Sequence, residues 1–293
     1  MSATPSTGRA LLGDAVRRLA AAGVESPRVD AELLLAAVLG VTRTALLTLG
    51  EVPGEQAARY AALVEERAVR VPLQHLTGTA PFRHLELSVG PGVFVPRPET
   101  ELLAGWVLTR IAGLAAPTVV DLGAGSGAIA LSVANEHPGA RVVAVERDAA
   151  AIEWTRHNAA ARAAAGDTPV EVLAGDMTDP ALLSELDGAV DVVVSNPPYV
   201  PDGARLPREV TEHDPPLALW GGPDGLDVVR GMLSTAARLL RPGGWLGIEH
   251  ADQQGSALPA LVRAHGRWAD VADHRDLADR PRYTTARSSP RGQ

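Results

Sequence analysis

The first seventy residues show the periodicity of amphipathic helices, with apolar residues every three or four positions and charged residues between them. The apolar positions of the first helix are Leu11, Leu12, Ala15, Val16 and Leu19. A strongly apolar second helix is predicted over residues 31–39, after a restart at Ser26-Pro27 and with an end at Gly40. Two more helices are predicted over residues 42–49 and 55–70. Four short helices predict a small bundle.

The pattern changes between residues 71 and 98. Prolines are expected to exclude a helix from this segment; they are Pro72, Pro81, Pro91, Pro96 and Pro98. Residues 85–89 alternate between apolar and polar, which predicts a strand, and the glycines after them predict a turn into a second strand at 93–95. We interpret this segment as a β-hairpin linker.

From residue 99 onward, apolar strands alternate with helical patterns. The strands are expected at residues 118–122, 141–145, 170–173, 190–194 and 245–249, and the helices at 101–114, after Gly127, at 150–164 and at 226–240. Uninterrupted apolar strands separated by helices indicate a parallel sheet covered on both faces. We therefore predict an α/β protein with a Rossmann-like sheet.

These patterns divide the chain into three parts. They are a helical domain over residues 1–72, a hairpin linker over 73–98 and an α/β domain over 99–293. The polar residues 1–9 are expected to be flexible, and the last ten residues, 284–293, are expected to be frayed.

Composition narrows the possible chemistry. The 293 residues include no Cys and no Lys, which excludes disulfides, thiolate metal sites and Schiff-base chemistry on a lysine. The eight His residues are scattered without metal-ligand spacing, so no metal is expected. The formal net charge of -8 opposes nucleic-acid binding on average. We find no apolar stretch long enough for a membrane span and no signal-peptide core, and expect a cytoplasmic protein.

A glycine-rich turn follows the strand at residues 118–122. The turn consists of Gly123, Ala124, Gly125, Ser126 and Gly127. Glycines let a backbone bend sharply and approach a ligand closely, and the helix that starts there offers free N–H groups. The next strand ends at Glu146, about 20 residues further, where such folds accept hydrogen bonds from ribose hydroxyls. The pair indicates an adenosine-containing cofactor, although a tight turn without a ligand would have the same sequence.

The spacing of these glycines distinguishes between two classes of cofactor-binding turn. Dinucleotide-binding turns read Gly-x-Gly-x-x-Gly. This turn reads Gly-x-Gly-x-Gly and follows Asp121. The spacing resembles motif I of the class I S-adenosylmethionine-dependent methyltransferases.

A second motif follows the strand at residues 190–194. It consists of Asn196, Pro197, Pro198 and Tyr199. Ligands of open parallel sheets bind outside the carboxyl ends of the strands, at the point where the strand order reverses. We expect this motif and the glycine turn to face one crevice.

The residue types of this second motif suit an amide or amino nitrogen as methyl acceptor. Such a nitrogen is a weak nucleophile that needs positioning more than a base. The Asn196 side-chain oxygen and the Pro197 carbonyl can accept its two N–H groups, and the Tyr199 ring can stack on a planar group. A rigid Pro-Pro turn without chemistry is the simpler interpretation.

Together, these motifs resemble those of the release factor glutamine methyltransferase family, also known as PrmC or HemK. The likeness extends over residues 10–287. Besides the two motifs, it is carried by Pro-Arg-Pro-Glu-Thr at residues 96–100, Gly-Gly-Pro-Asp-Gly-Leu at 221–226 and Pro-Gly-Gly-Trp at 242–245. The Asn-Pro-Pro-Tyr motif is shared with adenine and guanine amino-group methyltransferases and is less specific than the other segments.

The resemblance implies a substrate and a cofactor. It implies methyl transfer from S-adenosylmethionine to the glutamine of the Gly-Gly-Gln motif in class I peptide chain release factors, with the helical region as substrate-binding domain. Carried over by match, the cofactor would contact Gly123, Ala124, Gly125, Ser126, Gly127, Glu146, Met177 and Asn196. The catalytic and substrate-binding residues would be Asn196, Pro197, Pro198 and Tyr199. We expect a monomer, with no direct contact to nucleic acid or membrane.

Two departures and three open roles accompany this resemblance. Glu146 stands where the family commonly has Asp, and Met177 where it often has an aromatic residue. Asp176 borders the adenine in the resembled fold or is a simple turn residue. Arg97 and Glu99 shape the amino-acid end of the cofactor or serve as cap and salt-bridge residues. Glu212, His213 and Asp214 are interpreted as a solvated loop rather than as catalytic residues.

Two other functions are compatible with parts of the sequence. A DNA or RNA amino-group methyltransferase would require a concentrated basic face, which the net charge of -8 disfavours. A non-catalytic module that binds the cofactor and scaffolds a partner would bind without turnover, and the intact Asn-Pro-Pro-Tyr motif disfavours it.

Overall fold

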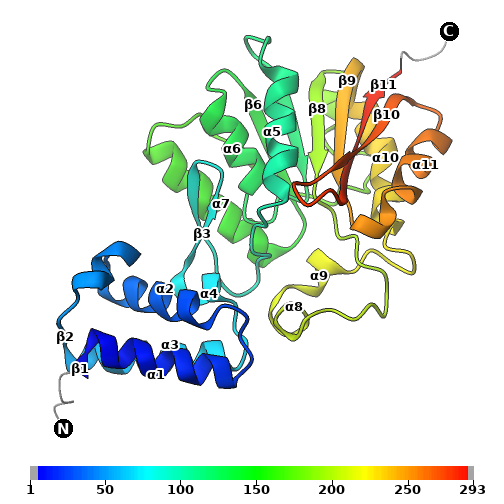
Figure 1. Cartoon of the computed structure of the whole chain (residues 1–293). Helices are drawn as coiled ribbons and strands as arrows, with labels where there is room; N and C mark the ends of the chain where they lie inside the picture. The colour runs from blue at the N-terminus through cyan, green and yellow to red at the C-terminus, as the bar shows by residue number, and fades with distance from the viewer. Residues whose placement is uncertain (1–5, 290–293) are drawn as a thin grey trace. The chain divides into compact units, whose positions relative to one another are not determined.

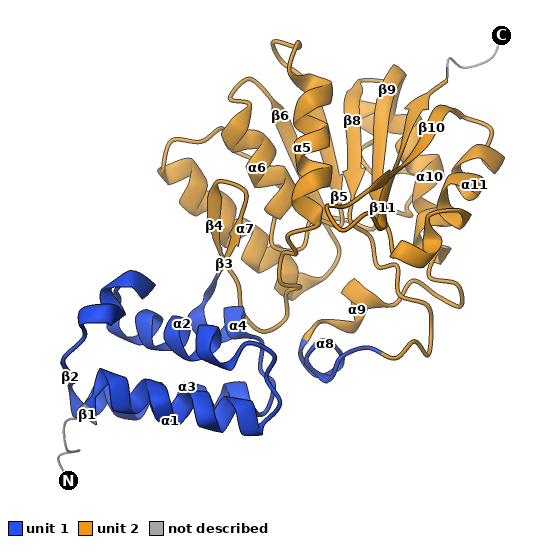
Figure 2. Cartoon of the chain, viewed as in Figure 1, with its two compact units in different colours: residues 1–79, 206–213 blue, residues 80–205, 214–293 orange. Residues whose placement is uncertain are grey.

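The structure is a computed structural model that describes residues 6–289. The chain forms two compact units (Figure 2). Unit 1 contains the described residues up to Thr79 together with Leu206–His213. Unit 2 contains Ala80–Arg205 and the described residues from Asp214 onward. A segment from the middle of the chain thus belongs to the N-terminal unit.

Unit 1 is a helical bundle, as its periodicity predicts. Its helices are α1 (Gly8–Ala21), α2 (Pro27–Leu39), the 3-10 helix η1 (Arg43–Thr48), α3 (Gly54–Ala68), α4 (Leu73–Thr77) and α8 (Arg208–His213). The short strands β1 (Ser6–Thr7) and β2 (Glu51–Val52) pair antiparallel. The helices α1, α2 and α3 bury Leu19, Leu34 and Tyr60 in one core. Gly40 ends α2 in the left-handed conformation, with a φ of 64°.

The helix α4 corrects the prediction that prolines keep residues 71–98 free of helix. Pro72 lies just before the first turn of α4, where its missing N–H leaves no helical hydrogen bond unmade. Gly78, with a φ of 80°, ends the helix. The prediction is confirmed only for residues 78–98, which contain no helix.

The hairpin also lies earlier than predicted. The strands β3 (Thr79–Phe82) and β4 (Leu85–Ser88) pair with each other, and Arg83 turns the chain with a φ of 52°. Residues 93–95 form no strand; Val93 and Val95 pack instead against Ala151 in a small buried cluster. The predicted hairpin turn at Gly90-Pro91-Gly92 is therefore wrong, because the apolar residues after it pack in this cluster and do not pair as a strand.

Unit 2 is built on a seven-stranded sheet in the order β10-β11-β9-β8-β5-β6-β7. The strands are β5 (Thr118–Leu122), β6 (Arg141–Glu146), β7 (Glu171–Ala174), β8 (Val190–Ser195), β9 (Leu240–Glu249), β10 (Trp268–Arg275) and β11 (Pro281–Ser288). The strands from β5 to β9 are mutually parallel, and β11 is antiparallel to both of its neighbours. The order reverses between β5 and β8, so the expected switch point is confirmed.

Helices cover both faces of this sheet, which confirms the predicted α/β class (Figure 1). On one face, α5 (Thr100–Ile111) and α6 (Ala128–Glu136) share a buried core with β5, β6 and β8. On the other face, α10 (Asp227–Leu239) and α11 (Ala257–Ala264) share a second core with the same strands and β9. The remaining helices are α7 (Ala149–Ala164), α9 (Pro216–Leu219), η2 (Ser184–Leu186) and η3 (Asp252–Gln254).

The C-terminal strand β11 corrects the expectation of a frayed end. Thr284, Thr285 and Ser288 are buried, and Thr285 pairs with Gly247 of β9. Threonine suits a pleated, half-buried surface, and the strand has a partner on each side. Residues 290–293 lie outside the described residues. Within residues 6–289, no helix has both the length and the apolar character needed to cross a membrane.

Candidate active site

The carboxyl ends of four neighbouring strands bring the predicted site residues together. The strands β5 and β6 pair Leu122 with Val145, and β6 and β7 pair Glu146 with Ala174. The Ser195 hydroxyl at the end of β8 donates to the Leu122 carbonyl at 2.6 Å. The loops that follow these strands therefore emerge at one edge of the sheet.

The glycine turn has a backbone conformation that strongly favours glycine. Gly123, Gly125 and Gly127 have φ values of 80°, 58° and 86°, in the left-handed region that other residues rarely adopt. A Cβ on Gly123 would lie 2.7 Å from the Met177 Cε atom and 3.9 Å from the Asn196 carbonyl oxygen. A Cβ on Gly125 would meet nothing within 4 Å. The turn thus contacts two other predicted site residues and leaves open space at its centre.

The Glu146 carboxylate holds this turn in place. One of its oxygens accepts the Gly125 N–H at 2.9 Å, and the other accepts the N–H groups of Arg147 and Asp148 at 2.7 and 2.9 Å. A carboxylate has about four acceptor positions, so about one is left for a ligand hydroxyl. The extra methylene of Glu, relative to Asp, lets one side chain reach both the turn and its own strand end.

Asp121, directly before the turn, is a buried acid with an incomplete set of partners. One carboxylate oxygen accepts the Ala130 N–H at 3.1 Å, and the other has no hydrogen bond to any residue between 6 and 289. Burial raises the pKa of Asp121 to about 7, and the nearby Glu146 charge adds to the effect. An orphaned acidic oxygen beside an open glycine turn fits a ligand that carries positive charge.

The loop after β7 contributes Asp176 and Met177. Asp176 accepts the N–H and the hydroxyl of Thr178 at 2.8 and 2.7 Å, and these hydrogen bonds lower the pKa of Asp176. It also lies 3.4 Å from an Arg147 nitrogen. Asp176 is therefore a turn residue in this structure. Met177 is buried and packs against the glycine turn.

The Asn-Pro-Pro-Tyr loop is rigid and tied down on one side. The rings of Pro197 and Pro198 are buried. The Asn196 amide nitrogen donates to the Thr100 hydroxyl at 3.2 Å, and the Tyr199 hydroxyl lies 3.4 Å from a Glu249 oxygen. Among the described residues, no hydrogen bond is donated to the Asn196 side-chain oxygen or to the Pro197 carbonyl. Two acceptors on a stiff loop can therefore bind a group with two N–H bonds.

Gly221 and Gly225 pack directly against the backbone of this loop. A Cβ on Gly221 would lie 2.6 Å from the Pro198 carbonyl oxygen, and one on Gly225 would lie 2.1 Å from the Tyr199 carbonyl oxygen. Val200 donates to the Leu219 carbonyl at 2.8 Å. These glycines allow two backbones to meet, a role that the sequence motif alone did not reveal.

Sequence reasoning missed the residues that support the loop, Thr100, Glu249 and Gln254. The Gln254 amide donates to the Tyr199 carbonyl at 3.0 Å. Glu249, at the carboxyl end of β9, is only 2% exposed. Burial raises the pKa of Glu249 to about 7, whereas hydrogen bonding from the Thr100 hydroxyl and the Arg282 charge oppose the rise. The sequence feature that could have indicated Glu249 is an acidic residue at the end of an apolar strand.

Arg97 has a structural role in this arrangement. It forms an ion pair of 2.9 Å with Asp214 and lies 4.7 Å from the centre of the Phe94 ring. Asp214 is buried, and Glu212 and His213 end the helix α8, so the expected solvated loop at residues 212–214 is wrong. Glu99 precedes the first turn of α5 and makes no side-chain capping bond.

Comparison with known proteins supports the methyltransferase fold. Residues 10–78 match the PrmC N-terminal domain, and residues 87–212 match the methyltransferase small domain. The structure of the T. thermophilus 16S rRNA N2 G1207 methyltransferase, in complex with AdoMet and guanosine, is 25% identical with a TM-score of 0.50. The match covers 72% of this chain and 49% of that chain. The fold and the site define a Rossmann-like methyltransferase.

Relatives of nearly full length narrow this class. The release factor glutamine methyltransferase of Mycolicibacterium smegmatis is 50% identical over 278 residues, which are 95% of this chain and 96% of the relative. The protein of the same name from Streptomyces coelicolor is 49% identical, over 95% of this chain and 97% of the relative. The chain belongs to the release factor glutamine methyltransferase family.

Proposed function

We propose that this protein transfers a methyl group from S-adenosylmethionine to the glutamine side chain of the Gly-Gly-Gln motif in class I peptide chain release factors. The observation that carries the proposal is the pair of available acceptors, the Asn196 side-chain oxygen and the Pro197 carbonyl. They lie on a proline-stiffened loop next to the glycine turn. A primary amide has two N–H bonds, which match two acceptors.

The residues of the loop act by positioning. An amide nitrogen has its lone pair delocalised, so catalysis depends on holding it at the right distance and angle. Asn196 and Pro197 accept its N–H groups, and the buried prolines reduce the entropy lost on binding. The Tyr199 ring offers a face on which the planar carboxamide can stack. The cofactor, when bound, supplies a methyl group that is already activated on a sulfonium.

The cofactor residues are proposed on the same basis. The turn from Gly123 to Gly127 gives the ligand close backbone approach, and the fourth acceptor position of Glu146 suits a ribose hydroxyl. Met177 packs beside the turn and suits an adenine ring, since its thioether is soft and adaptable. The acidic Asp121 suits the positive charge of the cofactor.

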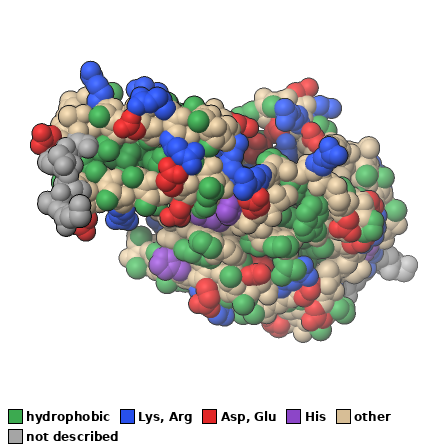
Figure 3. Space-filling view, turned by 90° about the horizontal axis from the view of Figure 1, so that it is seen from below, with side chains coloured by type: hydrophobic (Ala, Val, Ile, Leu, Met, Phe, Trp, Pro, Cys, Tyr) green, Lys and Arg blue, Asp and Glu red, His purple; other side chains and the backbone are tan. Residues whose placement is uncertain are grey.

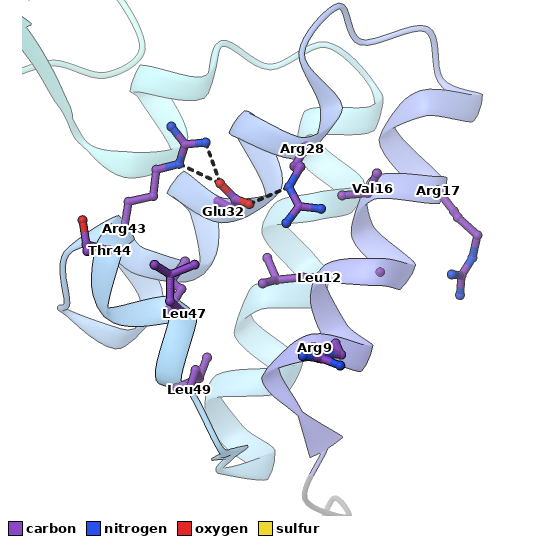
Figure 4. A pocket seen from close by; sticks show the side chains of 12 residues that line it. Arg9, Leu12, Val16, Arg17, Arg28, Glu32, Arg43, Thr44, Leu47 and Leu49 are labelled. Carbon is purple, nitrogen blue, oxygen red and sulfur yellow. Dashed lines mark hydrogen bonds and ion pairs between the residues drawn. The ribbon is translucent and has the colours of Figure 1, made fainter.

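Unit 1 offers a groove for the protein substrate, which supports its proposed role as substrate-binding domain. The groove has a volume of about 880 Å³ and lies between α1, α2 and η1 (Figure 4). Its apolar lining includes Leu12, Val16, Leu49 and Leu47, of which Leu47 is 84% exposed. Figure 3 shows hydrophobic side chains at the surface of unit 1 among basic and acidic ones.

The groove also has a surplus of positive charge. Its lining includes the four arginines Arg9, Arg17, Arg28 and Arg43, but only one acid, Glu32. Arg28 and Arg43 both pair with Glu32, at 2.9 and 2.6 Å, and Arg17 pairs with Asp14, which lies outside the lining. In a chain with a net charge of -8, this local surplus suits a partner segment with acidic and apolar side chains. We propose that the release factor docks there.

Mass spectrometry of a purified class I release factor, incubated with this protein and S-adenosylmethionine, tests the proposal. We expect one added methyl group on the Gly-Gly-Gln glutamine, and none with Asn196→Ala, whose unfolding temperature should stay close to that of the wild type. No methylation by wild-type protein that binds the cofactor would refute the substrate. Methylation of RNA or DNA in a parallel reaction would then favour the nucleic-acid alternative.

The proposed substrate also suggests where the enzyme works. Release factors act in translation, so we place the activity in the cytoplasm. One chain carries every residue of the proposed site, which is in keeping with a monomer.

A further inference from the structure

The proposed mechanism requires the Tyr199 ring to present one face to the substrate carboxamide. A ring on a loop keeps a fixed place only if the loop backbone and the far end of the ring are both held. The Tyr199 hydroxyl lies 3.4 Å from a Glu249 oxygen, which constrains the far end of the ring. The Tyr199 carbonyl accepts a hydrogen bond from the Gln254 amide nitrogen at 3.0 Å, which constrains the backbone. Both contacts come from residues 249–254, at and just after the end of β9.

The Gln254 carboxamide uses every hydrogen that it can donate. Its nitrogen has two hydrogens. One goes to the Tyr199 carbonyl, and the other goes to the Asp224 carbonyl at 3.1 Å. Its oxygen accepts the Ala251 N–H at 3.0 Å. Gln254 is only 5% exposed, so water cannot readily replace these partners. This side chain therefore joins three segments of the chain at one buried point.

The surroundings of Gln254 determine the orientation of its carboxamide. All three partners are backbone groups, and a backbone carbonyl can only accept whereas an N–H can only donate. Rotation by half a turn would place the oxygen against two carbonyls and the nitrogen against an N–H. A carboxylate at this position would also place an acceptor against the two carbonyls. The position therefore requires a side chain with two hydrogens on one atom and an acceptor on the other.

The segments that Gln254 joins are in close backbone contact. A Cβ on Gly225 would lie 2.6 Å from the Gln254 amide nitrogen and 2.1 Å from the Tyr199 carbonyl oxygen. Val200, the next residue of the loop, accepts the Gly221 N–H at 2.9 Å. No backbone N–H within residues 6–289 donates to the Tyr199 carbonyl, so Gln254 supplies its hydrogen bond. Loss of the Gln254 amide would therefore release the backbone of Tyr199 itself.

We propose that Gln254 is a positioning residue that, together with Glu249, fixes the place and tilt of the Tyr199 ring for the methyl acceptor. This inference deepens the proposed methyl transfer to glutamine and rests on it for its catalytic meaning. Gln254 acts through Tyr199 and takes no part in the chemistry itself. The position of the ring is a property of the protein alone and can be measured without substrate.

Nuclear magnetic resonance tests the position of the ring directly, because the chain contains only three tyrosines, Tyr60, Tyr199 and Tyr283. Labelling tyrosine with ¹³C gives three sets of ring signals, and Tyr199→Phe identifies the set of Tyr199. Gln254→Met keeps the length of the side chain and removes its hydrogen bonds. We expect it to shift the Tyr199 signals and to leave those of Tyr60, in unit 1, in place. Unchanged Tyr199 signals in Gln254→Met would overturn the proposal.

Kinetics with the release factor provides the second test. Gln254→Glu keeps the shape and the acceptor for the Ala251 N–H but places an oxygen against two carbonyls. We expect kcat to fall about tenfold to a hundredfold, since two hydrogen bonds are lost, while KM for the release factor changes little. The matched control is Gln253→Glu, the same change at the exposed neighbouring residue, which should keep the wild-type kcat. A wild-type kcat in Gln254→Glu would refute the positioning role.

The pH dependence of these variants separates positioning from a general loss of stability. At low pH the carboxyl of Gln254→Glu is protonated and can again donate one hydrogen to a carbonyl. The ratio of its kcat to that of wild type should therefore rise as the pH falls, whereas the ratio for Gln254→Met should stay constant. Taking the ratio removes the titration of Asp121 and Glu249, which all these proteins share.

A constant ratio for Gln254→Glu would contradict the assigned hydrogen bonds. If wild-type protein methylates no release factor, the proposed function fails, whereas the magnetic resonance result still decides whether Gln254 holds the Tyr199 ring.

Discussion

Three acidic residues at strand ends of unit 2 differ in their surroundings. Glu146 is half-buried and uses three of its acceptor positions on backbone N–H groups. Asp121 and Glu249 are buried, each with one oxygen that has no hydrogen bond within residues 6–289. Burial penalises a charge, so the pKa of both buried acids rises to about 7. The raised pKa makes Asp121 and Glu249 candidates for a pH-dependent role in the proposed site.

We predict that Glu146→Ala weakens binding of S-adenosylmethionine about tenfold to a hundredfold, because a charge-assisted hydrogen bond is lost. Isothermal calorimetry measures the affinity. Glu146→Asp, which keeps the carboxylate, is the matched control and should bind more tightly than Glu146→Ala. Equal affinity of Glu146→Ala and wild type would refute the ribose contact.

The raised pKa of Glu249 predicts a pH dependence of kcat. Below pH 7 the carboxyl becomes protonated and is a weaker acceptor for the Tyr199 hydroxyl, so the Asn-Pro-Pro-Tyr loop is held less firmly. We expect kcat to rise as the pH increases through about 7 and then to level off. In Glu249→Gln, which cannot titrate, this rise should disappear.

Asp121 is the necessary control for this pH profile, because its pKa is also raised to about 7. A rise that persists in Glu249→Gln and disappears in Asp121→Asn would assign the titration to Asp121. The profile must therefore be recorded at saturating cofactor for both variants.

At the scale of elements, the loop after β8 is held by segments that come from distant parts of the chain. The start of α5 reaches it through Thr100, the end of β9 through Glu249, and the glycines at 221–225 through their backbone. Unit 1 has a comparable device, since Arg67 of α3 pairs with Asp30 of α2 and Glu209 of α8 at 2.7 and 2.8 Å. In both units, the position of one element thus depends on side-chain contacts with elements from distant parts of the chain.

We predict that Gly225→Ala lowers kcat strongly and destabilises unit 2, because a Cβ would lie 2.1 Å from the Tyr199 carbonyl oxygen. Gly266→Ala is a matched control, because Gly266 has the same φ of 77° but no atom within 4 Å of the new Cβ. Its cost should be limited to backbone strain of about 1–3 kcal/mol. Equal activity of the two variants would contradict the bracing role.

We predict that Arg67→Ala destabilises unit 1 by about 3–5 kcal/mol, because it leaves the buried Asp30 carboxylate without its partner. The side chains of Arg67 and Asp30 are 8% and 9% exposed. Hydrogen exchange followed by mass spectrometry would locate the loss in the peptides of α2, α3 and α8. Arg18→Ala, which breaks an exposed pair with Glu65, should destabilise unit 1 far less, because water screens an exposed ion pair.

At the scale of the whole molecule, substrate recognition and chemistry are proposed to lie in different units. The proposed chemistry uses only residues of unit 2, and the proposed docking groove only residues of unit 1. Docking at a second place raises the effective concentration of the glutamine at the site without a new contact there. Variants of the groove should therefore affect KM more than kcat.

We predict that the double variant Arg9→Glu, Arg17→Glu raises KM for the release factor about threefold to tenfold and leaves kcat nearly unchanged. The difference from wild type should shrink at high ionic strength. Arg59→Glu, on α3 and outside the groove lining, is the control. An equal rise of KM in the control would show that overall charge, and not the groove, matters.

The sequence by itself determined the elements and the places of the two motifs. Helical periodicity fixed the long helices of unit 1, and apolar strands followed by Gly123 and Asn196 fixed the parallel sheet and its ligand edge. These signals are local, because a helix or strand is largely specified by residues within one window of the chain. The motifs also carried the family resemblance.

Only the tertiary structure decided how those motifs are supported. Thr100 and Asn196 are 96 residues apart in the chain. No periodic pattern in the nearby sequence predicts that Glu249 is buried or that Gly225 approaches Tyr199. The turn at Arg83 and the buried strand β11 were likewise settled by packing and pairing partners elsewhere in unit 2. The local sequence pattern predicts whether a segment forms a helix or a strand. The hydrogen-bond partner of a buried polar group, in contrast, is determined only when the whole chain has folded.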